Sequence, residues 1–329
     1  MFFTKLRSRA FFSRMYGDYV GDGICMMAKA PRYFNIALPD FSVQYFVASF
    51  KSTEDVVLTG TVPQDHVLYY SIVVYDTYGM PHSAINDTQL DKNFTYKLKA
   101  PPGTFYYCVI VRMYLDPIGA KKIQTLLVPK MTINGKEVKK LSQVQIKKNT
   151  DDLEAEFYGF LSKRSLPPGP KLKDHQFFMP PFVRLAQLFP NPDSVYLASF
   201  PFQSRVFRIT GTLPDNIGRS SNLRFFGFMA CNLQTTATDS AITFYDLAKK
   251  YTFWLAYSKK EAVKAGYKGD VPLLLFHDDN TAPFLVCRLV FVNNHPLKQA
   301  ALKDKEKPNL PDVCERIMKN TYPKVEALA

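Results

Sequence analysis

The sequence predicts a mainly β protein: a tandem duplication of a β-sandwich or jelly-roll-like unit, with few short helices and extended terminal arms. The first observation behind this prediction is composition. The 329 residues include 27 Phe, 19 Tyr, 23 Pro and one Trp, and 47% of the residues are hydrophobic. This much apolar material excludes wholesale disorder, and aromatic residues combined with many prolines favour short strands joined by turns.

The second observation is a repeat. "YFVASFKSTEDVVLTGTVP" (residues 45–63) is nearly repeated by "VYLASFPFQSRVFRITGTLP" (195–214), and both contain Ala-Ser-Phe and Gly-Thr-x-Pro. Further stretches match in the same order, ending with "VIVRMYLDP" (109–117) and "LVCRLVFVN" (285–293). The spacing between matching stretches grows from 150 to 157 and then to 176 residues. This growth predicts two insertions in the second copy, around "NIGRSSN" and around "SKKEAVKAGYKGDVP".

The repeat divides the chain into five segments. We expect the two copies to form β-rich units and the residues outside them to form arms and an extended linker. The predicted segments are a basic aromatic N-terminal arm (1–40), repeat 1 (41–161), a Pro/Lys-rich linker (162–176), repeat 2 (177–297) and a C-terminal tail with a short helix (298–329).

Apolar runs predict the strands of each copy. Residues 43–50 and 56–62 are typical of short strands separated by a charged turn. Pro63 ends the second strand, because proline cannot donate a hydrogen bond to a ladder. The runs 69–76 and 105–114 are apolar almost throughout, as expected for central strands that are covered on both faces.

Few segments favour helix. "KKEAVKAGY" (259–267) is one candidate, "LPDVCERIMKN" (310–320) is another with Pro311 in its first turn, and "DDLEAEFYGFL" (151–161) is a short third. The densest basic stretch, "KEVKKLSQVQIKK" (136–148), alternates polar and apolar residues. We predict that it is a solvated edge strand, with a nucleic-acid-binding patch as the alternative.

Charge bears on the partners of the protein. Forty-two Lys and Arg against 29 Asp and Glu give a net charge of +13, which suits an anionic partner. We expect protein subunits in a homo- or hetero-oligomer, with an acidic lipid or acidic protein surface as a further option, and we disfavour nucleic acid because the charge is diffuse.

The N-terminus is Arg-rich and has no acidic residue before Asp18. "MFFTKLRSRAFFSRMYG" is therefore either a mitochondrial presequence or an ordered arm that docks on a partner. The interface candidates in this segment are Phe2, Phe3, Arg7, Arg9, Phe11, Phe12 and Arg14.

The cysteines indicate the compartment. Cys108, Cys231 and Cys287 each lie inside an apolar run, and the five cysteines form no CxxC pair. Buried thiols in a reducing, intracellular compartment are the expected state. A mitochondrial location agrees with the N-terminus, and a virion or another organellar shell is the alternative.

The repeat also carries a recognisable order of motifs. In "YFVASFKSTEDVVLTGTVPQDHVLYYSIVVYDTYG" (45–79), a strand with Tyr and small residues leads through a Val-Pro turn to an aromatic strand ending in Tyr-Asp. "VIVRMYLDP" (109–117) adds an Arg-x-Tyr-x-x-Pro close. This pattern resembles a bacterial family of paired β-rich domains of unknown function, and the resemblance implies a sandwich or jelly-roll-like unit used twice. The family has Asp-Thr before its first Tyr, and here Asp193 alone could correspond to that Asp.

Little in the chain indicates catalysis. There is no nucleophile elbow, Walker A loop or GxGxxG motif. His277 stands beside Asp278 and Asp279, but adjacent strand residues point to opposite faces, so a turn is favoured over a metal or catalytic site. We therefore predict no catalytic, cofactor-binding or metal-binding residues and no cofactor.

Two arginines, Arg112 and Arg288, stand inside apolar strands at matching positions of the two copies. Removing the partner of a buried charge is strongly destabilising. Each arginine is therefore predicted to pair with a carboxylate such as Asp76 or with turn carbonyls, and binding of an acidic ligand is the alternative.

These observations together favour a non-catalytic structural or assembly protein, a subunit of a larger complex or of a self-assembling shell of capsid-like or organellar type. The alternative is an enzyme or small-ligand-binding protein with a pocket between the β-sheets. A second alternative is a protein that binds anionic lipid or nucleic acid through its basic face.

Overall fold

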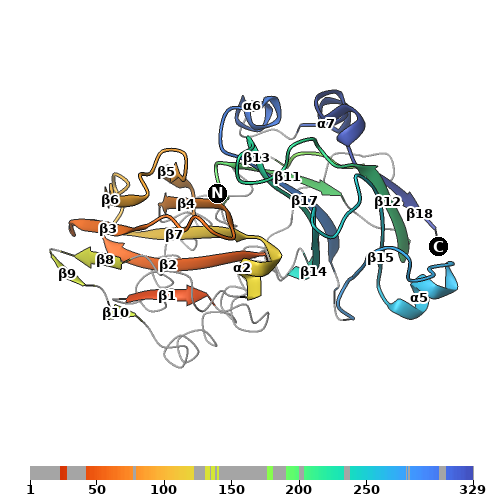
Figure 1. Ribbon diagram of the computed structural model, residues 1–329, viewed down its shortest axis with the longest axis horizontal. Helices are drawn as coiled ribbons and strands as arrows, with labels where there is room; N and C mark the ends of the chain where they lie inside the picture. Colours follow the sequence, from red (N-terminus) through yellow and green to blue (C-terminus); the bar gives the residue numbers. More distant parts are fainter. Residues whose placement is uncertain are drawn as a thin grey trace, which may run out of the picture. The chain divides into compact units, whose positions relative to one another are not determined.

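The fold is mainly β, as predicted, and the chain divides into two compact units (Figure 1). The computed structural model describes residues 23–27, 42–76, 79–121, 130–133, 135–137, 139–140, 176–180, 190–199, 204–232, 238–278, 280, 282–303 and 309–328. Among these, unit 1 contains the residues up to 140 together with 190–192, and unit 2 contains 176–180 and 193–328.

Unit 1 is built from two sheets. Its elements are β1 (Gly23–Met27), β2 (Val43–Lys51), β3 (Val56–Thr61), β4 (Val67–Tyr75), β5 (Pro81–Asn86), β6 (Asn93–Lys97), β7 (Tyr106–Leu115), α2 (Pro117–Lys121), β8 (Lys130–Ile133), β9 (Lys136–Glu137) and β10 (Lys139–Lys140). The larger sheet has the order β10-β1-β2-β7-β4-β5, and the smaller has the order β6-β3-β8-β9. The basic stretch 136–148 was predicted to be an edge strand, and its described residues form the edge strands β9 and β10.

Unit 2 repeats this plan. Its elements are β11 (Ser194–Ser199), β12 (Val206–Thr212), β13 (Leu223–Asn232), β14 (Thr238–Thr243), β15 (Lys250–Ala256), α5 (Lys259–Lys264), β16 (Leu273–Leu275), β17 (Pro283–Phe291), α6 (Pro296–Lys303), α7 (Pro311–Met318), η4 (Lys319–Thr321) and β18 (Lys324–Ala327). The sheet β11-β17-β13-β14 corresponds strand for strand to β2-β7-β4-β5, and β15-β12-β18 corresponds to β6-β3-β8.

The strand register shows the duplication residue by residue. In unit 1, Thr59 of β3 lies opposite Thr95 of β6 on one side and Lys130 of β8 on the other. In unit 2, Thr210 of β12 lies opposite Thr252 of β15 and Lys324 of β18. Since a slip of one residue would turn every side chain to the other face, such agreement means that the two units share one packing plan.

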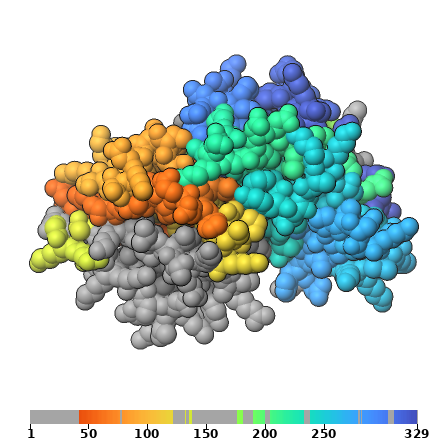
Figure 2. Space-filling model, viewed as in Figure 1, coloured from red at the N-terminus to blue at the C-terminus, as the bar shows by residue number. Residues whose placement is uncertain are grey.

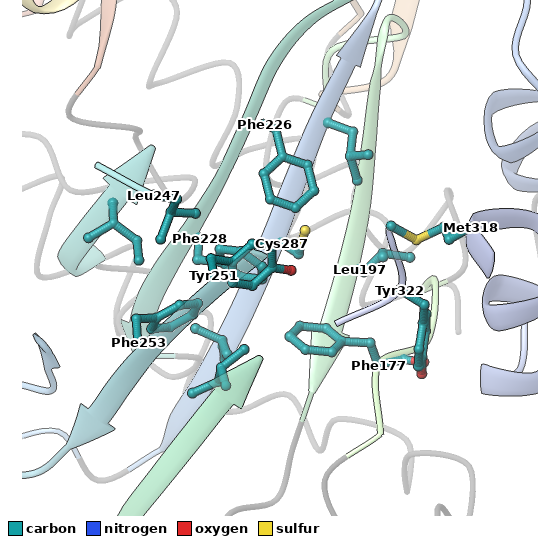
Figure 3. Close-up of a cluster of buried hydrophobic side chains, with 14 of the residues drawn as sticks. Phe177, Leu197, Phe226, Phe228, Leu247, Tyr251, Phe253, Cys287, Met318 and Tyr322 are labelled. Atoms are coloured by element: carbon teal, nitrogen blue, oxygen red, sulfur yellow. The ribbon is translucent and has the colours of Figure 1, made fainter. Parts of the chain in front are cut away.

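Central strands carry the core of each unit. Every residue of β4 and β13 is buried, and β7 and β17 are buried after their first residue. In unit 2, Figure 3 shows rings from β13 and β15 gathered together, and the centroid of Phe228 lies 4.8 Å from that of Phe253 and 5.7 Å from that of Tyr251. The predicted central strands covered on both faces are confirmed.

The insertions of the second copy fall where the spacing predicted them. One lengthens the connection between β12 and β13, and the other contains α5 and β16, which have no counterpart among the described residues of unit 1. The side chain of Ser258 caps α5 by accepting a hydrogen bond from the backbone N–H of Glu261, 3.2 Å away. Pro311 occupies the first turn of α7, as predicted.

The terminal segments differ from the expected arms. Within residues 1–40, β1 pairs with β2 and so extends the larger sheet of unit 1. Residues 298–329, expected as a tail with one short helix, contain most of α6, all of α7, and β18, which pairs with β12. The sequence did not predict β18, because this strand is short and largely exposed. Its pairing depends on backbone hydrogen bonds and leaves no apolar pattern in the sequence.

Other predicted features lie outside the described residues. These are the interface candidates of residues 2–14, nearly all of the linker 162–176 and the helix at 151–161. Within the described part of the chain, no helix has both the length and the apolar character that are needed to cross a membrane.

We predict that removing residues 323–329 destabilises unit 2 by about 2 kcal/mol or more. The deletion removes β18, one of the two strands that pair with β12, and with it the contact of Val325 with the core. Each ladder hydrogen bond between β18 and β12 contributes roughly 0.5–1.5 kcal/mol. Glu326→Ala is the matched control, because it keeps the backbone pairing and should cost less than about 1 kcal/mol. Chemical denaturation measures both, and an unchanged midpoint in the truncated chain would support a free tail.

Candidate functional site

The two buried arginines occupy equivalent places in their units. Arg112 of β7 is 5% exposed and lies opposite Tyr45 of β2 and Ser71 of β4. Its guanidinium carbon is 5.8 Å from the ring centroid of Tyr45 and 5.4 Å from that of Tyr75. The small Ser71 side chain leaves room beside the guanidinium in the sheet.

Arg288 of β17 repeats this arrangement. It is 4% exposed, lies opposite Tyr196 of β11 and Gly227 of β13, and its guanidinium carbon is 5.1 Å from the Tyr196 ring centroid. The match of Ala-Ser-Phe in the sequence aligns Tyr45 with Val195, which is one residue out of step with this pairing. Burial agrees with the structural alignment, because Tyr45 and Tyr196 are each the half-buried third residue of their strand.

These arginines are best explained as parts of the fold. A guanidinium over a tyrosine ring is stabilised by roughly 2 kcal/mol when the pair is desolvated, and the pair recurs because the unit is duplicated. The carboxyl group of Asp76, proposed as a partner, accepts a hydrogen bond from the backbone N–H of Met80 at 2.9 Å in the turn after β4. Pairing of Arg112 or Arg288 with a carboxylate stays a prediction.

The other titratable groups singled out in the sequence also have structural settings. The backbone N–H of Asn280 donates to the carbonyl of His277 at 2.9 Å, so the predicted turn is confirmed. Among the described residues, no three His, Cys, Asp or Glu side chains gather as they would around a metal ion. Burial raises the pKa of the Cys314 thiol to about 12 and that of Cys287 well above its usual value, which keeps both thiols protonated.

The described residues of unit 2 line a pocket of about 610 Å³, which we call the α6 pocket. It lies between the lengthened β12–β13 connection, the end of β17 and the C-terminal helices, and Figure 2 shows the green connection beside the blue helices at the surface. Its polar lining residues are Asp215, Asn216, Ser220, Ser221, Asn222, His295 and Thr321. Its apolar lining residues are Pro214, Leu223, Leu289, Phe291, Leu297, Ile317 and Met318.

At the corresponding place in unit 1, the described residues pack closely together. The connection between β3 and β4 has five residues (62–66), whereas the connection between β12 and β13 has ten (213–222). In unit 1, Nδ1 of His66 lies 3.0 Å from Oδ2 of Asp116, and α2 packs directly on this pair. Gly119 comes so close that a Cβ there would lie 2.6 Å from the His66 carbonyl oxygen. Only glycine fits this contact.

Hydrogen bonds to Asp116 stabilise this contact between α2 and the β3–β4 connection. Burial acts to raise the pKa of Asp116, but hydrogen bonds from the backbone N–H of Gly119, at 2.7 Å, and from His66 lower it below its usual value overall. In unit 2 the same region contains α6 and the pocket. The pocket therefore exists because the second copy has a longer connection and a longer helix after its central strand.

His295 is one of the polar residues that line the α6 pocket. It precedes Pro296 at the start of α6, and its Nδ1 accepts a hydrogen bond from the backbone N–H of Leu297 at 3.2 Å. The neutral ring therefore carries its proton on Nε2. The ring stacks on Phe291, with centroids 3.9 Å apart and planes 8° apart, and its burial lowers the pKa of His295.

Two ion pairs lie near the pocket. Lys249 pairs with the carboxylate of Asp215 and donates to the carbonyl of Leu213 at 2.8 Å. Lys298 of α6 lies 2.5 Å from Oδ1 of Asp193, and both side chains are mostly buried. The Asp193 that the family resemblance singled out thus anchors α6 against the start of β11.

Sequence reasoning did not select His295. Its signal was the stretch "NHPLK", in which a residue able to accept a hydrogen bond precedes a proline at the first position of a helix. That signal marks a helix start and not a pocket, because the facing residues come from segments far away in the sequence.

Comparison with known proteins indicates fold but no activity. No family model and no curated protein matches the chain, so the resemblance to the paired β-rich domains stays a prediction. The structure is similar to that of an uncharacterized protein from Burkholderia cenocepacia, with a TM-score of 0.53 and 12% identity over 98% of this chain and 87% of that one. It also matches the VPA0106 protein from Vibrio parahaemolyticus, with a TM-score of 0.46 and 10% identity over 99% of this chain and 100% of that one.

We predict that His295 makes unit 2 sensitive to acid. The folded state holds the ring neutral with a pKa below the usual value of about 6.5, whereas the unfolded chain takes up a proton near that value. Its contribution to stability is therefore complete above about pH 6.5 and is lost as the pH falls, by at most ~1.4 kcal/mol per pH unit for one proton.

His295→Asn is the matched control, because Asn can cap Leu297 but does not titrate. The difference in Tm between the native protein and this variant should shift against the native protein from pH 7.5 to pH 5. A difference that stays constant over this range would contradict the prediction.

Proposed function

We propose that the protein is a non-catalytic binding protein that holds a small molecule in the α6 pocket. The observation that carries the proposal is the contrast between the two units: the second copy has an open pocket where the first is closed by His66, Asp116 and Gly119. The pocket volume of about 610 Å³ falls within the range of ligand pockets, roughly 300–1,000 Å³.

The contrast matters because both copies have the same strand plan. In unit 1, a connection of five residues is enough to join the equivalent strands β3 and β4. The sheets therefore do not require the longer connection of unit 2. The pocket combines apolar and polar lining residues, as ligand recognition requires, and many of them come from the longer connection and from α6 and α7.

Binding is favoured over catalysis by how the pocket holds its titratable groups. Nδ1 of His295 accepts a backbone hydrogen bond, and the carboxylate of Asp215 pairs with Lys249. A nucleophile is activated by a base within hydrogen-bond reach that is free to take its proton. The His295 ring, whose Nδ1 is engaged in this way, is instead suited to donating a hydrogen bond from Nε2.

The proposal predicts that compounds from a fragment library raise the Tm of the full chain and that Ser221→Trp abolishes these shifts. Ser221 is a half-buried pocket residue, so the indole should fill the space. A ligand at a concentration of 100 times its Kd stabilises a protein by ~2.7 kcal/mol, which is easily measured.

Asp65→Trp is the control, because Asp65 is exposed in the short connection of unit 1 that corresponds to the pocket loop. Hits should behave alike on this variant and on the native chain. If no compound distinguishes Ser221→Trp from the native protein, the pocket is not a binding site.

We retain assembly as a second proposed function, favoured by the net charge of +13 and by the acid-free, Arg-rich start of the chain. An arm with many aromatic side chains can bury them on a neighbouring subunit while its arginines contact carboxylates or phosphates. A mitochondrial or virion setting remains part of this proposal.

Deletion of residues 2–17 should leave the circular dichroism spectrum unchanged but abolish any oligomer that the full chain forms. Size-exclusion chromatography with light scattering compares the two chains at several concentrations. If the truncated chain assembles as the full chain does, this segment serves only as a targeting peptide.

A further inference from the structure

We infer that the α6 pocket selects an uncharged molecule with a flat apolar body and a hydrogen-bond acceptor at one end, received by the Nε2–H of His295. This inference rests on the proposed function and adds to it the chemical class of the ligand. It is carried by the charges and the apolar lining of the pocket and by the tautomer of His295.

The charges of the pocket disfavour an ionic ligand. Among the described lining residues, Asp215 and His295 are the two with ionisable side chains. Asp215 pairs with Lys249, and His295 accepts a backbone hydrogen bond at Nδ1, which only the neutral ring can do. A charged ligand would lose hydration on entering the pocket without gaining an opposite charge, and this loss is costly.

The floor of the pocket suits a flat apolar body. Leu289 and Phe291 of β17 are 1% and 3% exposed, and Met318 at the end of α7 is 6% exposed. Phe291 and His295 form a parallel stack in which His295 is the half-buried member, so His295 presents the flat aromatic surface. Planar rings pack on such a surface in offset stacks, with a gain beyond the area that they bury.

The His295 ring, which lines the pocket, has a defined tautomer. Because Leu297 N–H occupies Nδ1, the hydrogen of the neutral His295 ring is on Nε2. Thr321, by contrast, already donates its hydroxyl hydrogen to the carbonyl of Met318 at 2.7 Å. A ketone, ester or ether oxygen is the partner that Nε2–H requires, at a heavy-atom distance of ~2.9 Å.

Four probes with one ring system and different heads test the inference on the full chain. They are acetonaphthone (a neutral acceptor), ethylnaphthalene (no acceptor), naphthoate (an anion) and naphthylmethylammonium (a cation), measured by calorimetry at pH 7.5. We expect acetonaphthone to bind about tenfold more tightly than ethylnaphthalene, as one net hydrogen bond predicts, and more tightly than either ion. Tighter binding of naphthoate or of naphthylmethylammonium would overturn the inference.

One variant assigns the effect to His295. His295→Phe keeps a ring beside Phe291 but removes Nε2–H, so acetonaphthone should fall to the affinity of ethylnaphthalene, while ethylnaphthalene binds as before. An acetonaphthone preference that survives this substitution would contradict the role of His295. The order of the four probes on the native chain tests the ligand class even if this variant fails to fold.

The outcomes separate this inference from the proposed function. If Ser221→Trp blocks the binding of fragments but none of the four naphthalenes binds to the native chain, the pocket is a binding site and the ligand class is wrong. If Ser221→Trp changes the binding of neither the fragments nor the naphthalenes, both the function and the inference fail.

Discussion

Both units are organised around one strand that is buried on both of its faces, β7 in unit 1 and β17 in unit 2. Such a strand fixes its neighbours, because every side chain must meet a partner on one face or the other. Its single arginine sets the strictest condition. Arg112 and Arg288 each lie between a tyrosine on one adjacent strand and a small residue on the other, and a slip of one residue would break this arrangement.

That constraint explains why the two copies keep their strand register but differ at their ends. The central strands cannot change without unpacking two faces, whereas the connections at the end of the sheets are only partly buried. Unit 1 uses this freedom to close the end with a short connection and the contact between Gly119 and His66. Unit 2 uses it to place α6, held by Lys298 and Asp193, over an open pocket.

Some charged and polar residues near the pocket hold α6 in place, and others line the pocket. Asp193 and Lys298 form a mostly buried pair that positions α6. His295 then has two roles at one place, because it caps α6 through Nδ1 and lines the pocket with the rest of its ring. The hydrogen bond from Leu297 N–H to Nδ1 holds the His295 ring in a single orientation.

Sequence reasoning by itself determined the mainly β fold, the duplication, the two insertions and the helices α5 and α7, because apolar periodicity, turn residues and helix caps are local signals. Tertiary structure decided the rest. The match of Ala-Ser-Phe is out of step with the pairing of Tyr196 and Arg288, since register depends on contacts across the sheet. The place of β18 depends on backbone hydrogen bonds to β12, which no side-chain pattern records. The α6 pocket joins residues 214–223 to residues 289–321, and only the folded chain brings such distant segments together.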